Sequence, residues 1–144
     1  MKAVVQRVEH ASVTADGKTV GSIEKGLFVL LGISKDDTEK EAERIVKKLV
    51  GLRIFADGEG KTNLSLADVD GQLLIVSQFT LYADARKGNR PSFTDAAPAD
   101  KAEYLYEYFI SLAKKSVKTV EKGSFGAHMD ISAGLDGPFT IILE

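Results

Sequence analysis

The stretch Leu27-Phe28-Val29-Leu30-Leu31-Gly32-Ile33 is apolar at every position except Gly32. A short continuous apolar run is typical of a strand buried on both faces, so residues 27–33 are predicted to form the central strand of a sheet. The chain before this run supplies neighbours. Residues 2–8 alternate as a strand does, and the segments 12–15 and 18–23 flank Asp16-Gly17, the strongest short signal for a hairpin.

Two helices are predicted on either side of the middle of the chain. Thr38-Glu39-Lys40-Glu41 is a capping box. It is followed by apolar residues at helical spacing, namely Ala42, Ile45, Val46, Leu49 and Val50, with Gly51 where a C-terminal cap belongs. Pro98 opens the second helix. Its buried stripe is predicted to be Ala102, Leu105, Phe109, Leu112 and Ala113, and Lys114 and Lys115 close it, which suits the helix dipole.

The remaining segments complete a single domain that spans residues 1–144. Strands are expected at residues 52–55, 72–81, 117–120, 128–132 and 139–143, a polar loop at 56–70, and an irregular, partly basic segment at 84–97. No internal repeat or linker is visible. The predicted fold is α+β, a largely antiparallel β-sheet or barrel with two packed helices.

Composition limits the function. The formal net charge is -2, whereas proteins that follow long nucleic acids carry a basic face; a grip on one end of an RNA remains compatible with this balance. The chain has no cysteine, which excludes a disulfide scaffold, a thiolate zinc site and a cysteine nucleophile. No signal peptide or membrane span is recognisable, so the expected location is the cytoplasm.

Familiar catalytic signatures are absent. Gly60-Lys61-Thr62 resembles the end of a phosphate-binding loop, but the position of the required first glycine is Phe55 and no helical pattern follows. Only two histidines exist, His10 and His128, and neither lies in a hydrolase motif. Together with the scattered carboxylates they form no ligand set, so no metal and no cofactor are expected.

Two segments have both a structural and a functional interpretation. The first is Ser77-Gln78-Phe79-Thr80, where an apolar strand runs into polar side chains. It is either a strand leaving the core or a strand end that lines a pocket, with backbone N–H groups free to bind an oxyanion. The second is Asp136-Gly137-Pro138-Phe139-Thr140. By itself, Gly-Pro indicates a hairpin turn before the last strand.

These two segments resemble the motifs Ser-Gln-Phe-Thr and Asn-x-Gly-Pro-x-Thr of the D-aminoacyl-tRNA deacylases, formerly called D-tyrosyl-tRNA deacylases. The resemblance extends over the whole chain. It includes the opening strand with Gln6 and Arg7, the loop Lys87-Gly88-Asn89-Arg90-Pro91-Ser92-Phe93, and Phe125-Gly126-Ala127 with Met129. One departure is Leu135, where the family usually has Asn. It affects the local support of the Gly-Pro turn and not its backbone groups.

The resemblance implies a homodimeric cytoplasmic esterase that hydrolyses D-aminoacyl-tRNA and rejects L-aminoacyl-tRNA. A cis Gly137-Pro138 peptide would enter the partner's pocket and exclude L side chains with its carbonyls. Achiral glycine would escape this filter, so glycyl-tRNA is an expected second substrate. Arg7 would brace the Gly-Pro segment, and Thr140 belongs to the same binding group.

Catalysis is assigned, by the same resemblance, to the segment Ser77-Gln78-Phe79-Thr80. The backbone N–H groups of Phe79 and Thr80 would bind the oxyanion, and the ribose 2′-hydroxyl of the tRNA would replace a protein base. The alternative, Thr80 Oγ as a nucleophile, lacks a neighbouring base in the sequence. Ser77 and Gln78 would position the substrate, while Arg86, Lys87 and Arg90 are candidates for contact with phosphates of the acceptor end. Two rivals remain: a hydrolase that tolerates L-residues, and a non-catalytic binding module.

Overall fold

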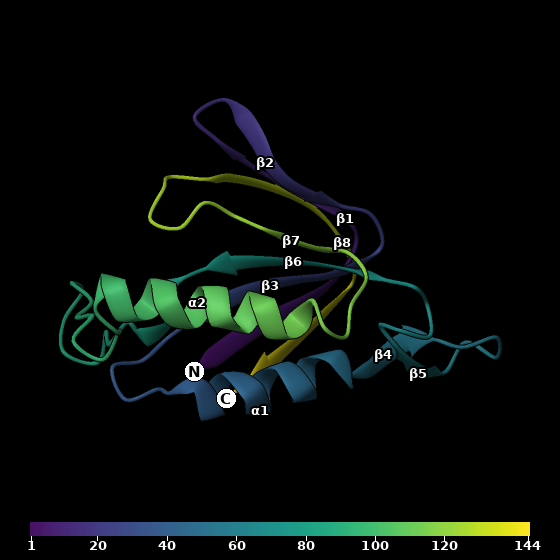
Figure 1. Ribbon diagram of the computed structural model, residues 1–144, viewed down its shortest axis with the longest axis horizontal. Coiled ribbons are helices and arrows are strands. Elements are labelled where there is room, and N and C mark those ends of the chain that lie inside the picture. Colours follow the sequence, from purple (N-terminus) through teal and green to yellow (C-terminus); the bar gives the residue numbers. More distant parts are fainter.

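The strand predicted at residues 27–33 is β3 (Gly26–Gly32), and it lies in the middle of the main sheet of the computed structural model (Figure 1). The structure describes all 144 residues. Five strands follow the order β2-β1-β3-β6-β7, and β8 pairs with β1. The other strands of this sheet are β1 (Lys2–Ala15), β2 (Lys18–Ile23), β6 (Gln72–Ser77), β7 (Val120–Lys122) and β8 (Asp130–Leu143), and β3 pairs directly with β1 and β6. Every residue of β3 is buried except Leu30, which is half-buried, so the prediction of a central strand is confirmed.

β1 organises the sheet because it pairs with three strands. One of its edges pairs with β8 over residues 3–14, and the other pairs first with β3 and then with β2. The sequence predicts two separate strands here, but the chain continues through both as one strand of 14 residues. The hairpin is confirmed: Ala15 faces Lys18, and Asp16 and Gly17 have φ of 50° and 74°, as a type I′ turn requires.

The sheet is mixed and nearly closed into a barrel. β1 is antiparallel to β2, β3 and β8, whereas β3, β6 and β7 run parallel to one another. β2 and β7, the two strands at the ends of this order, form no ladder with each other but lie close together. A Cβ atom added at Gly21 would lie 2.6 Å from the carbonyl oxygen of Lys122. The α+β barrel-like sheet with two helices is confirmed, while its parallel part was not predicted.

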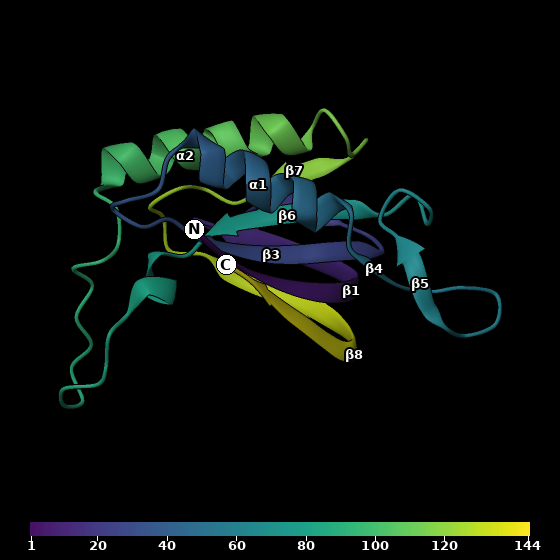
Figure 2. The same ribbon diagram turned by 90° about the horizontal axis from the view of Figure 1, so that it is seen from below.

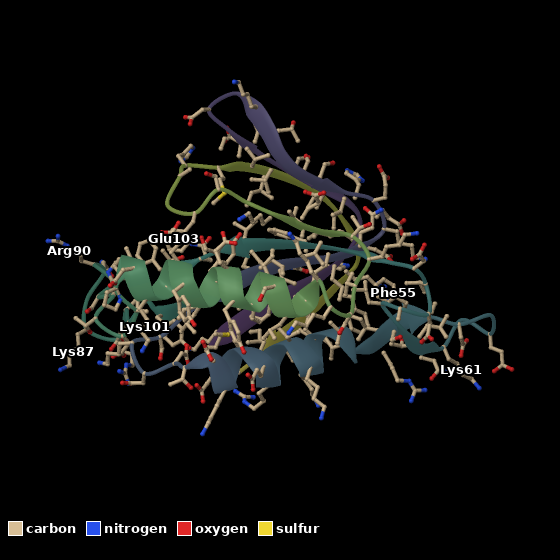
Figure 3. The ribbon with its side chains drawn as sticks, in the orientation of Figure 1. Phe55, Lys61, Lys87, Arg90, Lys101 and Glu103 are labelled. Carbon is tan, nitrogen blue, oxygen red and sulfur yellow. The ribbon has the colours of Figure 1, made fainter.

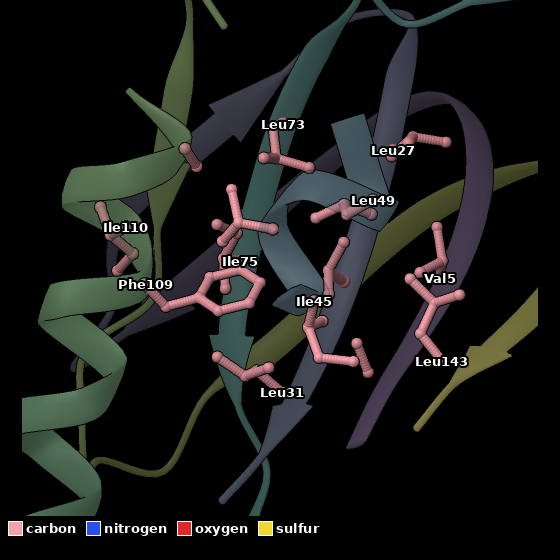
Figure 4. Close-up of a cluster of buried hydrophobic side chains, with 14 of the residues drawn as sticks. Val5, Leu27, Leu31, Ile45, Leu49, Leu73, Ile75, Phe109, Ile110 and Leu143 are labelled. Atoms are coloured by element: carbon pink, nitrogen blue, oxygen red, sulfur yellow. The ribbon is translucent and has the colours of Figure 1, made fainter. Parts of the chain in front are cut away.

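Both helices, α1 (Glu39–Val50) and α2 (Ala99–Ala113), cover the same face of the sheet (Figure 2). The predicted capping box is present at the start of α1, and Pro98 precedes α2. The main core fills the space between the helices and the sheet, where Phe109 of α2 and Ile45 of α1 face Ile75 of β6 (Figure 4). Each such side chain contributes about 1.5–3 kcal/mol through burial. Neither helix is long and apolar enough to span a membrane.

Three local predictions are wrong. Residues 56–70 contain a strand, β5 (Thr62–Ser65), which pairs with β4 (Arg53–Ala56); a four-residue strand is too short to show a period. The strand expected to reach residue 81 ends at Ser77, and a 3-10 helix, η1 (Phe79–Tyr82), follows. Gly137-Pro138 is not a hairpin turn, because β8 runs through it while pairing with β1 on both sides.

Candidate functional site

The end of β6 presents two backbone N–H groups that lack a partner within their own element. The Gln78 amide still donates to the carbonyl of Leu31 at 2.8 Å, as a continuation of the sheet. The chain then turns into η1, whose first internal bond runs from the Leu81 amide to the Gln78 carbonyl at 3.3 Å. Because 3-10 bonds span three residues, the amides of Phe79 and Thr80 have no acceptor inside this helix.

Ser77 and Gln78 are half-buried, Phe79 and Thr80 are exposed, and the segment carries no general base. The Gln78 side-chain amide donates to Thr80 Oγ1 at 2.5 Å, so the partner of the hydroxyl is an uncharged donor. Phe79 is 56% exposed, and its ring packs edge-on against Phe93, with the ring centroids 5.1 Å apart. Ser77 is half-buried at the last position of β6. The segment thus combines free amides with an aromatic surface, and nothing in it would deprotonate Thr80.

Gly137-Pro138 lies in a wide bulge of β8. On one side of the bulge Gln6 faces Thr140, and on the other Val8 faces Leu135. The single residue Arg7 therefore stands opposite the four residues 136–139, and the strand arches outward there. The Gly137-Pro138 peptide is cis, Gly137 has φ of 128°, and both residues are exposed.

Arg7 lies against this bulge. Its Nε is 2.9 Å from Asp136 Oδ2 and 3.3 Å from the Asp136 carbonyl oxygen. Nη1 donates to the carbonyl of Ile54 in β4 at 2.6 Å, and the guanidinium carbon is 4.7 Å from the centroid of the Phe139 ring. Thr140, just beyond the bulge, donates from its hydroxyl to Gln6 Oε1 at 2.6 Å.

The two motifs are far apart within one chain. Strand register places Ser77 level with Leu31 and Ala3, and Arg7 level with Leu27. The bulge opposite Arg7 is therefore four residues along the sheet from Ser77, or about 13 Å, and three strands across it, or about 14 Å. A single small substrate cannot contact both motifs of the same chain.

An apolar row lies between the two motifs on the face of the sheet that the helices leave open. Val4 faces Leu30 on one side and Ile142 on the other. Its neighbours Ala3 and Val5 belong to the core under the helices, so the alternation of a strand directs Val4 to the opposite face. Val4 and Leu30 are half-buried and Ile142 is 63% exposed.

The loop after η1 carries the three cations predicted to contact phosphate. They line one cavity of about 630 Å³ together with Asp84 and Ser92. Arg86 is bound by Asp84 through two contacts, Nε–Oδ1 at 2.9 Å and Nη2–Oδ2 at 2.7 Å, and this pairing holds the pKa of the Asp84 carboxyl well below its usual range. Lys87 and Arg90 form no ion pair, and Figure 3 shows both at the outer end of the loop.

Three contributors to the site were given no role by the sequence. Asp136 and the Ile54 carbonyl both bind Arg7, and Gln6 binds Thr140. Asp136 could have been found from its place next to Gly137-Pro138. The Ile54 carbonyl could not, because a backbone group 47 residues away carries no sequence signal. Residues 125–129, which belong to the resemblance, follow β7. Just before them, the Gly123 amide donates to the Ile75 carbonyl of β6 at 3.1 Å.

Residues 4–144 match the family model described as D-Tyr-tRNA(Tyr) deacylase. Proteins named D-aminoacyl-tRNA deacylase from Thermosipho africanus and Desulfatibacillum aliphaticivorans are 54% and 56% identical over 144 residues, which is 100% of this chain and 97% and 99% of those proteins.

Two solved structures are also similar. One, described as c-Myc DNA Unwinding Element Binding Protein, has a TM-score of 0.95 at 46% identity and covers 100% of this chain and 98% of its own. The other, "Structural Analysis of a probable eukaryotic D-amino acid tRNA deacylase", has a TM-score of 0.86 at 19% identity over 99% of this chain and 97% of its own. At that identity the second likeness shows the fold alone.

Proposed function

The chain belongs to the D-aminoacyl-tRNA deacylase family, and is thus a hydrolase that deacylates D-aminoacyl-tRNA; from this premise we propose that two copies build each active site. One copy supplies the Ser77-Gln78-Phe79-Thr80 segment, and the other supplies Gly137-Pro138. The observation that carries this proposal is the separation of the two motifs within one chain, about 13 Å along the sheet and about 14 Å across it. A two-fold pairing brings each motif to the partner's other motif.

The open face supports such a pairing. The row Val4, Leu30 and Ile142 lies between the two motifs, where the axis of a symmetric dimer would pass. Ile142 is 63% exposed and continues into the half-buried Val4 and Leu30, and contiguous apolar surface of this kind marks interaction sites. The homodimer therefore covers this row and seats the exposed Gly137-Pro138 bulge of each copy at the partner's β6 end.

Chiral selection follows from the shape of this composite pocket. The bulge presents backbone of Gly137 and Pro138 to the substrate, and their carbonyls occupy the space that an L side chain would need. A D side chain points elsewhere, so L-aminoacyl esters are rejected by a clash and not by a lost contact. Glycine has no side chain to clash, and glycyl-tRNA is accordingly a second substrate. Arg7 and Thr140 hold the two sides of the bulge.

The chemistry needs no protein nucleophile. Water adds to the ester carbonyl carbon, the amides of Phe79 and Thr80 donate to the resulting oxyanion, and the bond to the ribose oxygen breaks as that oxygen regains a proton. The tRNA 2′-hydroxyl lies next to the ester and relays the proton. Ser77 and Gln78 position the substrate. The only recorded partner of Thr80 Oγ1 is the Gln78 amide, which cannot activate it.

The acceptor end of the tRNA approaches along the loop at residues 84–95. Lys87 and Arg90 have no carboxylate partner, and they are the cations of this loop available to phosphate. Arg86 is already neutralised by Asp84, so it contributes less to binding than its charge suggests. The enzyme acts where tRNA is charged, in the cytoplasm.

The direct test compares hydrolysis of D-tyrosyl-, L-tyrosyl- and glycyl-tRNA by the purified protein. We expect rapid loss of the D-ester and the glycyl ester, and an L-ester that decays at its spontaneous rate. Rapid hydrolysis of the L-ester would identify a hydrolase without chiral selection. An intact D-ester at high protein concentration would instead favour a binding module.

Thr80→Ala separates the two catalytic schemes. If the backbone amides act, kcat for D-tyrosyl-tRNA should fall by less than about tenfold, since only the contact with Gln78 is lost. Loss of a true nucleophile costs several orders of magnitude, on the order of 10⁴ or more. Single-turnover deacylation measures the difference, and a loss of that size in a folded Thr80→Ala protein would establish the hydroxyl as the nucleophile.

A further inference from the structure

The bulge at residues 136–139 must find support outside the strand ladder. Its ends are fixed by the pairs Gln6–Thr140 and Val8–Leu135, but the residues between them face only Arg7 of β1. Backbone that leaves a ladder needs other partners or it fluctuates. The conformation of Gly137-Pro138 therefore depends on what Arg7 does.

Arg7 is itself held from two sides. Its Nε forms an ion pair with the Asp136 carboxylate at 2.9 Å and donates a hydrogen bond to the Asp136 carbonyl at 3.3 Å. Its Nη1 donates to the Ile54 carbonyl at 2.6 Å. The fork of a guanidinium is planar and rigid, so two anchored nitrogens fix the plane of the group. The side chain is only 14% exposed, and this plane lies against the Phe139 ring at 4.7 Å. The remaining nitrogen, Nη2, is 3.5 Å from where a Cβ of Gly137 would stand.

We propose that Asp136 is a positioning residue for chiral selection, acting through Arg7. Its carboxylate fixes the guanidinium against the bulge, and the guanidinium fixes the Gly137-Pro138 backbone that excludes L side chains. This inference rests on the proposed function and assigns to Asp136 a share of the discrimination between D- and L-esters. Asp136 does not touch the substrate.

The sequence around Asp136 leaves no substitute for it. Leu135 is apolar and 49% exposed, so its side chain can neither donate nor accept a hydrogen bond. Gly137 and Pro138 have no polar side chain either. In the segment 135–138, Asp136 is therefore the only residue whose side chain can anchor the bulge, and it is bound to the one β1 residue that faces it.

The test measures kcat/KM for D-tyrosyl- and L-tyrosyl-tRNA in Asp136→Asn and Asp136→Ala. We expect the D/L ratio to fall by about tenfold in Asp136→Ala, because the variant loses the ion pair with Arg7; tenfold corresponds to about 1.4 kcal/mol. L-hydrolysis rises while kcat for the D-ester changes little. Asp136→Asn, which keeps the size and one acceptor, should fall between Asp136→Ala and the unmodified protein. Asp130→Asn is the matched control on the same strand, where the carboxylate contacts no arginine.

A double-mutant cycle with Arg7→Lys tests whether Asp136 works through Arg7. Lysine keeps the charge but cannot reach Asp136 and Ile54 together. We expect Asp136→Asn to have no further effect on the D/L ratio once Arg7 is Lys. The inference would be overturned if the effects of Arg7→Lys and Asp136→Asn on the D/L ratio multiplied in the double variant. It would also be overturned if the D/L ratio were unchanged in Asp136→Asn and Asp136→Ala. If the unmodified protein itself lacks D/L discrimination, the proposed function fails instead, so the two failures are distinguishable.

Discussion

At Gly137 the backbone conformation excludes any other residue. Its φ of 128° lies in a region that L side chains rarely adopt, and a Cβ would stand 2.8 Å from the Phe139 amide nitrogen. Backbone atoms cannot move aside as the end of a flexible side chain can. The glycine is thus required by the shape of the bulge, which is also the part of the chain that we place in the partner's pocket.

Gly137→Ala should therefore lower both stability and activity. Strain of this kind costs about 1–3 kcal/mol, and relief by reshaping the bulge would displace Pro138. We expect a lower Tm and a D-tyrosyl-tRNA deacylation rate reduced at least tenfold, measured by thermal unfolding and single-turnover kinetics. Gly58→Ala, at a glycine with open space around it and no positive φ, is the control. Full activity in Gly137→Ala would show that the bulge does not take part in the site.

Among the elements, α1 is the one whose start is written most clearly in the sequence. Thr38 donates to the Glu41 carboxylate from its backbone at 2.7 Å and from its hydroxyl at 2.6 Å. The side-chain hydrogen bond, followed by the backbone one, lowers the pKa of Glu41 from its ordinary 4.5. A lowered pKa means that the charged form favours the folded state. This contribution is present above about pH 4.5 and is lost as the pH falls through the lowered value.

Glu41→Gln should flatten part of the acid dependence of stability. Glutamine can still complete a capping box, but it does not titrate. The Glu41 carboxylate becomes protonated between about pH 5 and about pH 3. We expect the fall in Tm over this range to be smaller in the variant than in the unmodified protein. Glu9→Gln, at an exposed glutamate of β1, serves as control. Identical pH profiles for Glu41→Gln and the unmodified protein would contradict the coupling.

For the whole molecule, the open face of the sheet links fold and activity. The helices cover one face and leave the row Val4, Leu30 and Ile142 uncovered on the other. A stable dimer buries roughly 800 Å² of the surface of each partner. A charged side chain placed in the middle of that surface would be buried without an oppositely charged partner. The proposed composite site therefore makes activity depend on association.

Ile142→Asp should yield a monomer that loses deacylase activity. Each chain keeps both motifs, but without a partner its Ser77-Gln78-Phe79-Thr80 segment has no Gly137-Pro138 bulge beside it. Sedimentation or size-exclusion chromatography gives the mass, and D-tyrosyl-tRNA hydrolysis at the same concentration gives the activity. Val20→Asp, at an apolar residue on β2 that is 40% exposed, should change neither. A monomer with full activity would mean that one chain holds the complete site.

Features of this fold that depend on neighbouring residues could be predicted from the sequence, whereas features that depend on distant residues could not. The central strand, the Asp16-Gly17 hairpin and both helices were predicted because each depends on a pattern within about a dozen neighbouring residues. β5 and the end of β6 were not, since a four-residue strand and a 3-10 turn carry no such period. The motifs at Ser77 and Gly137 were found by resemblance, but not their separation, which follows from strand order.

The central strand, the Asp16-Gly17 hairpin, both helices, the α+β class and the family could all be predicted from the sequence, because periodicity, caps and motifs lie in consecutive residues. Three features are visible only in the folded chain: β8 continues through Gly137-Pro138, Arg7 is clamped between Asp136 and the Ile54 carbonyl, and the two motifs lie on opposite sides of an uncovered apolar row. These contacts join residues 47 and 129 positions apart. Pairing between β1 and β8 sets the contact of Arg7 with Asp136, and the position of β4 sets its contact with Ile54. No local pattern encodes either arrangement.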